Sequence, residues 1–176
     1  MGAINLYFTG HNDLMGWAIG LGTGGFPYHH VGAIANGYPF RSGDLVSAHW
    51  GDGLQVRVDE DEGGWTHWAN VRVPVPDYVE RKFYRWLKDH VGEKYAKGAI
   101  FDMAWTTLTA CGVPSRWPSR WVCSSSIEQA MVAAGEYPDI KPISIRLYTP
   151  RDVFVSSIAK PGATWSVRLP GAPLVV

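Results

Sequence analysis

The chain has 176 residues, of which 46% are hydrophobic and 13% aromatic. This length suits a single domain over residues 1–176, and the hydrophobic fraction is typical of a globular protein with its own core. Sixteen basic and sixteen acidic residues cancel, so there is no overall field that would attract nucleic acid or an anionic membrane.

The termini and the apolar stretches bear on location. No apolar stretch approaches the ~20 residues that span a bilayer, and the N-terminus lacks a basic leader followed by an apolar run. We therefore expect no transmembrane segment and no signal peptide. Synthesis in a cytoplasm follows, and any delivery to a cell wall or association with a phage would depend on another component. The composition indicates no oligomeric state.

The first half of the chain predicts a series of strands. Apolar or alternating patterns predict them at 3–8, 31–35, 45–50, 54–58 and 68–75, with Asn36-Gly37 as a hairpin turn. Between these strands the sequence predicts a short helix from about 12 to 21, a glycine-rich turn at 20–25 and an acidic loop at 59–64.

The second half predicts helices. Apolar residues at helical spacing mark 77–91, 98–110 and 123–134, and Thr149 begins a short final helix. The segment 112–118 is expected to be a loop, residues 136–148 to be irregular with a short strand, and the Pro/Gly-rich tail to add little. Strands followed by helices predict an α+β fold.

Cys123 is the first candidate for chemistry. It precedes Ser124-Ser125-Ser126 and an apolar helical pattern, which together indicate a helix start. Unpaired N–H groups and the positive end of the helix dipole would favour the thiolate and lower the pKa of the thiol. The alternative is a buried structural cysteine. Cys111, at a helix end where a thiolate is disfavoured, is interpreted as structural.

A cysteine nucleophile needs a base, and six histidines are present. His30 stands at the start of the apolar strand, where an imidazole can be held rigidly. His49 lies on the return strand and can approach His30 across the ladder, with Ser47 as a competitor for the same orienting role. His29 should point to the opposite strand face from His30.

These segments resemble a known family. His30-Val31-Gly32, followed by an apolar run and a Gly turn, is similar to the signature of NlpC-type cell-wall peptidases. Gly92 to Tyr95 is similar to a Gly-x-x-Tyr segment of that family, and Trp121 to Ser125 to its Cys-helix start. The nucleophile comes last, which is the permuted order of the YiiX/YebB-like and lecithin-retinol-acyltransferase-like branch.

The resemblance implies a papain-like antiparallel sheet packed against helices, a Cys-His-polar triad, and no metal or other cofactor. Carried across, Cys123 is the nucleophile and His30 the base, while the third member is His49 or Ser47, with His49 preferred. Tyr95 is either an oxyanion donor or a core aromatic. The implied reaction is cleavage of an amide in peptidoglycan peptides through a thioester.

Other interpretations stay open. Lipid acyl esters are a second substrate class, and a non-catalytic module of the same fold could bind a lipid, peptide or sugar. A zinc site is less favoured, because the candidate side chains lack the usual ligand spacings. Large aromatic residues flank the candidate segments and could line a cleft or belong to the core. The zinc candidates are His29, His30, His49, Asp52 and His67, and the aromatic residues are Trp17, Phe26, Tyr28, Trp50 and Trp121.

Overall fold

The computed structural model describes residues 1–10, 26–49, 51–57, 67–96, 122–135 and 149–168. In these residues the chain forms a six-stranded sheet with the order β4-β3-β2-β1-β5-β6, in which every neighbouring pair is antiparallel. The strands are β1 (Gly2–Gly10), β2 (His30–Ile34), β3 (Leu45–His49), β4 (Gly53–Arg57), β5 (His67–Val75) and β6 (Thr164–Arg168). The helices of the described part are α2 (Asp77–His90), α4 (Cys123–Ala134) and α5 (Pro150–Ile158).

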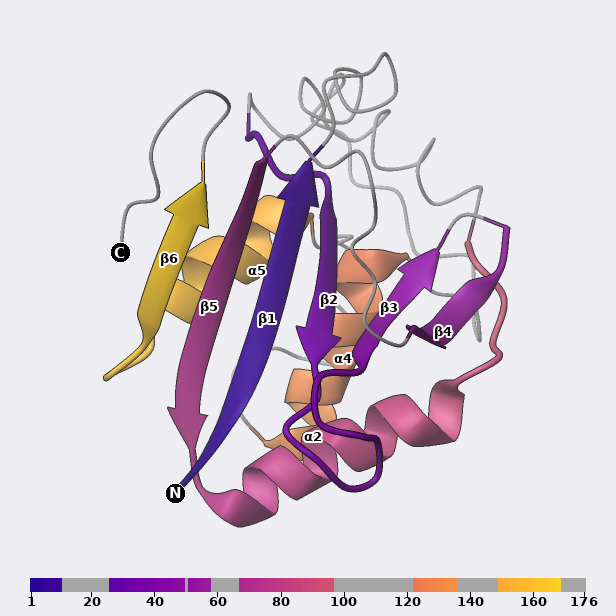
Figure 1. Ribbon diagram of the computed structural model, residues 1–176, viewed down its shortest axis with the longest axis horizontal. Helices are drawn as coiled ribbons and strands as arrows, with labels where there is room; N and C mark the ends of the chain where they lie inside the picture. Colours follow the sequence, from indigo (N-terminus) through magenta and orange to yellow (C-terminus); the bar gives the residue numbers. More distant parts are fainter. Residues whose placement is uncertain (11–25, 50, 58–66, 97–121, 136–148, 169–176) are drawn as a thin grey trace.

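The helices cover one face of the sheet (Figure 1). Along β1 the residues Ile4, Leu6 and Phe8 are fully buried against them, since alternate side chains of a strand point to opposite faces. In β5 the predicted apolar face 69, 71, 73 and 75 is likewise buried in the core. The expected α+β fold, with an antiparallel sheet packed against helices, is therefore confirmed.

Helix α2 begins after Pro76 and buries the apolar side of its amphipathic pattern. Its Tyr84 hydroxyl donates to the carbonyl of Ile34 at 2.6 Å, which joins the helix to the end of β2. The helix ends at His90, and Gly92 adopts a positive φ of 92°, a conformation that favours glycine. The predicted boundaries 77–91 are thus confirmed to within one residue.

Helix α4 starts at Cys123 and ends at Ala134, as predicted, and Gly135 takes the left-handed conformation that closes it. Helix α5 also begins as expected: Thr149 Oγ1 accepts from the N–H of Asp152, and the Asp152 carboxylate accepts from the N–H of Thr149. Such a reciprocal pair satisfies N–H groups that a helix start leaves open.

One element of the tail corrects the sequence analysis. The tail was expected to add little, but Thr164–Arg168 forms the edge strand β6 against β5, with Val71 opposite Trp165. The alternating pattern in Thr-Trp-Ser-Val-Arg covers only five residues and lies near Pro and Gly, so it is a weak sequence signal for a strand. The predicted helices at 12–21 and 98–110, the segments 20–25, 59–64 and 112–118, and the irregular stretch 136–148 lie outside the described residues.

Candidate active site

Cys123 is the first residue of α4, and local hydrogen bonds fix the start of this helix. Ser125 Oγ accepts from the N–H of Val122 at 3.1 Å, and Ser126 Oγ donates to the carbonyl of Cys123 at 2.8 Å. The Ser125 hydroxyl satisfies an N–H group that a helix start leaves open, and the Ser126 hydroxyl bonds back to the carbonyl three residues earlier. The serines that predicted the helix start therefore have that structural role.

The sulfur of Cys123 lies against the edge of β2. The thiol donates to the carbonyl of His29, with 3.9 Å between Sγ and O. The N–H of Val31 points at the same sulfur, as do the N–H groups of Ser124 and of Cys123 itself. Since His29 and Val31 flank His30, the structure brings the sulfur to the backbone on both sides of the candidate base.

The sulfur lies beside the start of β2, on the edge of that strand that faces β3. The N–H of Ala35 donates to the carbonyl of Asp44 at 2.9 Å, so the odd-numbered N–H groups of this stretch face the β3 side. Strand β2 pairs with β3 at Ala33↔Val46 and Ile34↔Leu45. Farther along the same edge, the N–H of Val31 faces the sulfur of Cys123.

Burial governs the ionisation of this thiol. Cys123 is only 5% exposed, and loss of solvation raises its pKa from 9.0 to about 11, although the nearby N–H groups act in the opposite direction. The expected lowering of the pKa was therefore wrong. The helix start supplies the N–H groups as predicted, but their effect is smaller than the cost of removing a thiolate from water.

The histidines meet on the face of the sheet opposite to α2, α4 and α5. The rings of His30 and His49 lie 5.0 Å apart between centroids, and Ser47 Oγ is 2.6 Å from His49 Nε2. A Cβ added to Gly32 would lie 2.8 Å from Cβ of Ser47, so these positions share one face. Ser47 and His49, treated as competitors from the sequence, are hydrogen-bonded neighbours.

Strand alternation separates the histidine rings from the core. Val31 and Ala48 are fully buried and belong to the core beside the helices, so His30 and His49 project toward the other face. Cys123 belongs to the same core, and its sulfur reaches only the backbone on either side of His30. The contact between His30 and His49 that the sequence predicted is confirmed, while their catalytic roles stay predictions.

The placement of His29 does not follow the simple strand alternation that the sequence predicted. Its N–H donates to the carbonyl of Thr9 at 3.0 Å, while Thr9 is also the partner of His30 in the ladder. Two residues of one strand thus oppose one residue of the other, as in a β-bulge, where regular alternation breaks down. Alternation therefore gives no ground for excluding His29, whose carbonyl contacts the thiol.

Tyr95 lies near the thiol. Burial raises the pKa of its phenol, and the charge that Cys123 would carry as a thiolate raises it further. The ring also packs against the hydrophobic core. The two interpretations of Tyr95, oxyanion donor and core aromatic, are therefore compatible in one position.

Two buried polar residues were missed by the sequence analysis. Thr9 is opposite His30, and its buried Oγ1 has no hydrogen-bond partner among the described residues. Glu128, 6% exposed on α4, has its pKa raised to about 7 by burial and by the charge of Asp152. The alternation Leu6-Tyr7-Phe8-Thr9 could have placed Thr9 on the face of His30, whereas Glu128 resembles an ordinary helix residue.

Several other sequence predictions have structural outcomes. Phe26 and Tyr28 pack in an aromatic group with Phe8 and Phe154, at centroid separations from 5.1 to 6.5 Å. Tyr28 belongs to the core, and Phe26 packs against it. Trp17, Trp50, Cys111 and Trp121 lie outside the described residues, and so does the side chain of His67. Within the described ranges, no three His, Cys, Asp or Glu side chains gather as a metal site would require.

Comparisons with known proteins add little to this geometry. No family model matches the chain, and no curated protein does. Among solved structures it is similar to one described as the crystal structure of metalloprotein YiiX from Escherichia coli O157:H7. The identity is 13% and the TM-score 0.47, over 97% of this chain and 98% of the other. Likeness at this level carries no argument about function.

Of the helices that the structure describes, none combines the length and the apolar character needed to span a bilayer.

Proposed function

We propose that this chain is a papain-like cysteine hydrolase of the permuted NlpC type, with Cys123 as nucleophile and His30 as base. One observation carries the proposal: the Cys123 sulfur, at the start of a helix, contacts the backbone on both sides of His30. The ring of His30 in turn meets His49, which bonds Ser47. A nucleophile, a base and an orienting polar group are the parts that covalent acyl transfer requires.

The proposed reaction begins from a neutral thiol. With a pKa of about 11, Cys123 is protonated at neutral pH, so the proton must leave as the sulfur attacks. The ring of His30 projects from the other side of β2 than the core that holds Cys123, so in this scheme the imidazole turns toward the sulfur and accepts that proton. Sulfur then forms a bond to the carbonyl carbon of an amide. The N–H groups at the start of α4 stabilise the oxyanion. His30 then protonates the leaving amine, and water hydrolyses the thioester.

The hydrogen bond between Ser47 and His49 has a defined part in this scheme. It leaves Nδ1 of His49 as the other polar atom of that ring and holds the ring in one orientation beside His30. A positive charge on His30 during the reaction is then stabilised by a neighbour whose ring is held in place. His49 and Ser47 together, rather than either alone, form the third member of the proposed triad.

The substrate class follows from the family resemblance. Peptide amides of peptidoglycan are the first choice, and lipid acyl esters the second. Both reactions pass through the same thioester. An enzyme of either kind needs no metal or organic cofactor for this chemistry.

A second candidate is a non-catalytic binding module with the same fold. The observation that favours it is the burial of the sulfur, which donates to a main-chain carbonyl as a structural thiol would. Such a module would bind a peptide, lipid or sugar without turnover.

Digestion of purified bacterial peptidoglycan separates these candidates. New amino termini, detected by mass spectrometry, should form with the parent chain and with Cys111→Ser, and should be lost in Cys123→Ser and His30→Ala. A chromogenic acyl ester tests the second substrate class with the same variants. Product that persists in Cys123→Ser would refute the proposed nucleophile, and no product on either substrate from a folded chain would favour the binding module.

A further inference from the structure

A hollow of about 420 Å³ lies on the face of the sheet opposite the helices. Its polar lining comes from three strands: Asn5 of β1, Asn70 and Arg72 of β5, and Thr164 and Ser166 of β6. In the ladder, Asn5 is opposite Arg72 and Arg72 is opposite Thr164, while Asn70 is opposite Ser166. Neighbours across a ladder present their side chains on the same face, so these groups converge.

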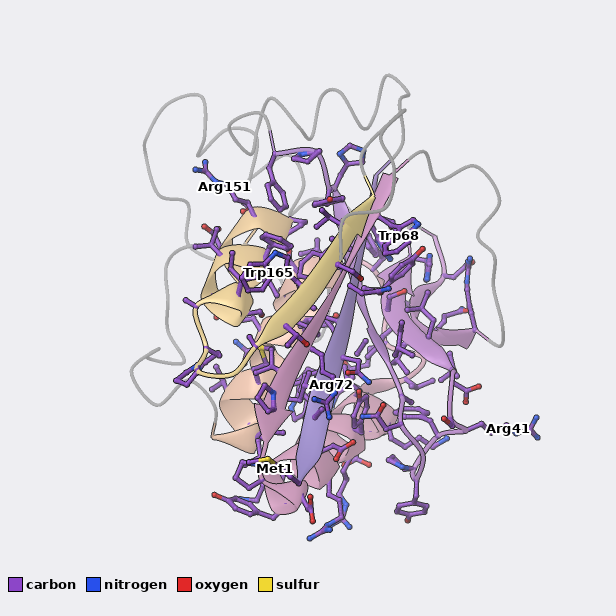
Figure 2. All side chains as sticks on the ribbon, turned by 60° about the vertical axis from the view of Figure 1, so that its left-hand side comes forward. Met1, Arg41, Trp68, Arg72, Arg151 and Trp165 are labelled. Atoms are coloured by element: carbon purple, nitrogen blue, oxygen red, sulfur yellow. The ribbon has the colours of Figure 1, made fainter. Side chains whose placement is uncertain are left out.

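This hollow and the candidate catalytic histidines share a face. Tyr7 is opposite both Asn70 and Gly32, and Thr9 is opposite both Trp68 and His30. The rows that carry Asn70 and His30 are therefore successive rows on one side of the sheet. Figure 2 shows the labelled Arg72 and Trp68 away from α5, whereas Trp165 lies beside that helix.

Arg72 gives the hollow its charge. It is exposed and, among the described residues that line the hollow, it is the one that carries a charge. No acidic side chain of the described residues forms an ion pair with it. A planar guanidinium with five donors matches a carboxylate in charge and in shape.

The two asparagines supply acceptors. Asn70 Oδ1 is buried and has no hydrogen-bond partner among the described residues. This state costs free energy, and a turn of the side chain toward a donor in the hollow would remove that cost. Asn5 Nδ2 donates to Asn36 Oδ1, and Asn36 Nδ2 donates to Glu80 Oε1 at 2.8 Å. This chain of bonds orients the Asn5 amide and leaves its oxygen as an acceptor. Peptide N–H groups are the donors that both oxygens suit.

We propose that this hollow binds a carboxylate-bearing peptide, with the carboxylate on Arg72 and peptide N–H groups on Asn70 and Asn5. The placement rests on the proposed function, because the peptide would then run along the sheet toward His30. Two strand spacings and four residues along a strand separate Arg72 from His30, roughly 17 Å. An extended peptide covers that span with about five residues, so the carboxylate would lie about five residues from the bond that is cleaved.

The test uses Cys123→Ser, so that binding is measured without turnover. The probe is N-acetyl-penta-alanine with a free carboxylate, compared with its C-terminal amide by NMR titration of the ¹⁵N-labelled chain. We expect the acid to bind about tenfold more tightly, the size of one exposed charge-assisted hydrogen bond. Shift changes should centre on β5 and β6. A C-terminally amidated peptide with one internal Glu shows whether a side-chain carboxylate serves as well as a terminal one.

Arginine variants make the assignment specific. Arg72→Gln should remove the preference for the acid, and Arg72→Lys should retain part of it. Arg81→Gln is the matched control, because Arg81 is an exposed arginine on α2, which contacts the sheet from the other side. Equal affinity for acid and amide, or an equal loss in Arg72→Gln and Arg81→Gln, would overturn the proposal.

Failure of this site is distinguishable from failure of the hydrolase. Peptide binding that depends on Arg72, in a chain whose parent form cleaves nothing, would retain the site and remove the enzyme. Cleavage that depends on Cys123 but is indifferent to Arg72→Gln, for acid and amide substrates alike, would remove the site and retain the enzyme.

Discussion

Alkylation of Cys123 by iodoacetamide across pH tests how the thiol is held. The thiolate is the reacting form, so the rate should follow its titration. Burial raises the pKa from 9.0 to about 11, and this lowers the thiolate fraction about 100-fold at any pH below both values. We therefore expect slow labelling at neutral pH, with a rate that still rises between pH 9 and pH 11.

The assay is peptide mapping by mass spectrometry, which separates Cys123 from Cys111. Because limited access also slows alkylation, the informative quantity is the midpoint of the pH profile rather than the rate itself. The same chain in denaturant is the control, since there Cys123 should titrate near the ordinary value. Within the proposed mechanism, the high midpoint means that His30 removes the proton during attack.

A profile that reaches its plateau below pH 8 would refute this reasoning. It would mean that the thiolate is already stabilised, through an ion pair with an imidazole, strongly enough to outweigh the cost of burial. The catalytic proposal would survive in that case, but the neutral resting thiol would not.

Three further predictions concern stability and the proposed triad. Glu128 has a pKa raised from 4.5 to about 7, so between these values the folded chain retains a proton that the unfolded chain loses. The free energy of unfolding should therefore fall by up to about 3 kcal/mol as pH rises from 4.5 to 7. Thermal and urea unfolding should show a smaller fall in Glu128→Gln. Gly53→Ala should lower the free energy of unfolding by more than about 2 kcal/mol, because φ at Gly53 is +84° and the added Cβ would overlap the main chain that follows α2. Gly51→Ala should lower it by about 1 kcal/mol, because φ there is +99° but the space around the added Cβ is open. Ser47→Ala removes the 2.6 Å partner of His49, so peptide turnover should fall about tenfold with KM unchanged.

Each of these has a result that would count against it. An unchanged pH slope in Glu128→Gln would mean that the carboxyl is solvated in the folded chain. Equal unfolding midpoints for the two glycine variants would contradict the close approach at Gly53. A Ser47→Ala variant with raised KM and normal turnover would place Ser47 in substrate binding instead of histidine orientation.

Much of the fold could be predicted because the relevant signals are local. Alternation of apolar residues predicted the buried face of β5, and apolar residues at helical spacing predicted α2. The serines after Cys123 located the start of α4 at the correct residue, since hydroxyl caps depend only on neighbours in sequence. The expectation that His49 on the return strand approaches His30 was also met. The connection between the two strands is longer than a two-residue turn at Asn36-Gly37, because Ala33 pairs with Val46 and the N–H of Ala35 donates to the carbonyl of Asp44.

The ionisation of Cys123 could not be predicted in the same way. The helix start was visible in the sequence, but burial of the sulfur depends on which distant strand packs over it. The bulge at His29 is likewise invisible, because it arises from how β1 and β2 pair near Thr9. Predicting the hollow around Arg72 would require the register of β6 against β5, and the short alternating pattern of β6 was not recognised as a strand.

The segment after α2 has a consequence for association between sheets. Gly92 N–H donates to the carbonyl of Leu54 at 2.8 Å, and Leu54 N–H donates to the carbonyl of Glu93 at 2.9 Å. These bonds occupy the outer edge of β4, so an incoming chain could not extend the sheet there without first displacing the segment that carries Tyr95. Strand addition at that end would therefore disturb the surroundings of the thiol, which links protection against edge-to-edge aggregation to the integrity of the candidate site.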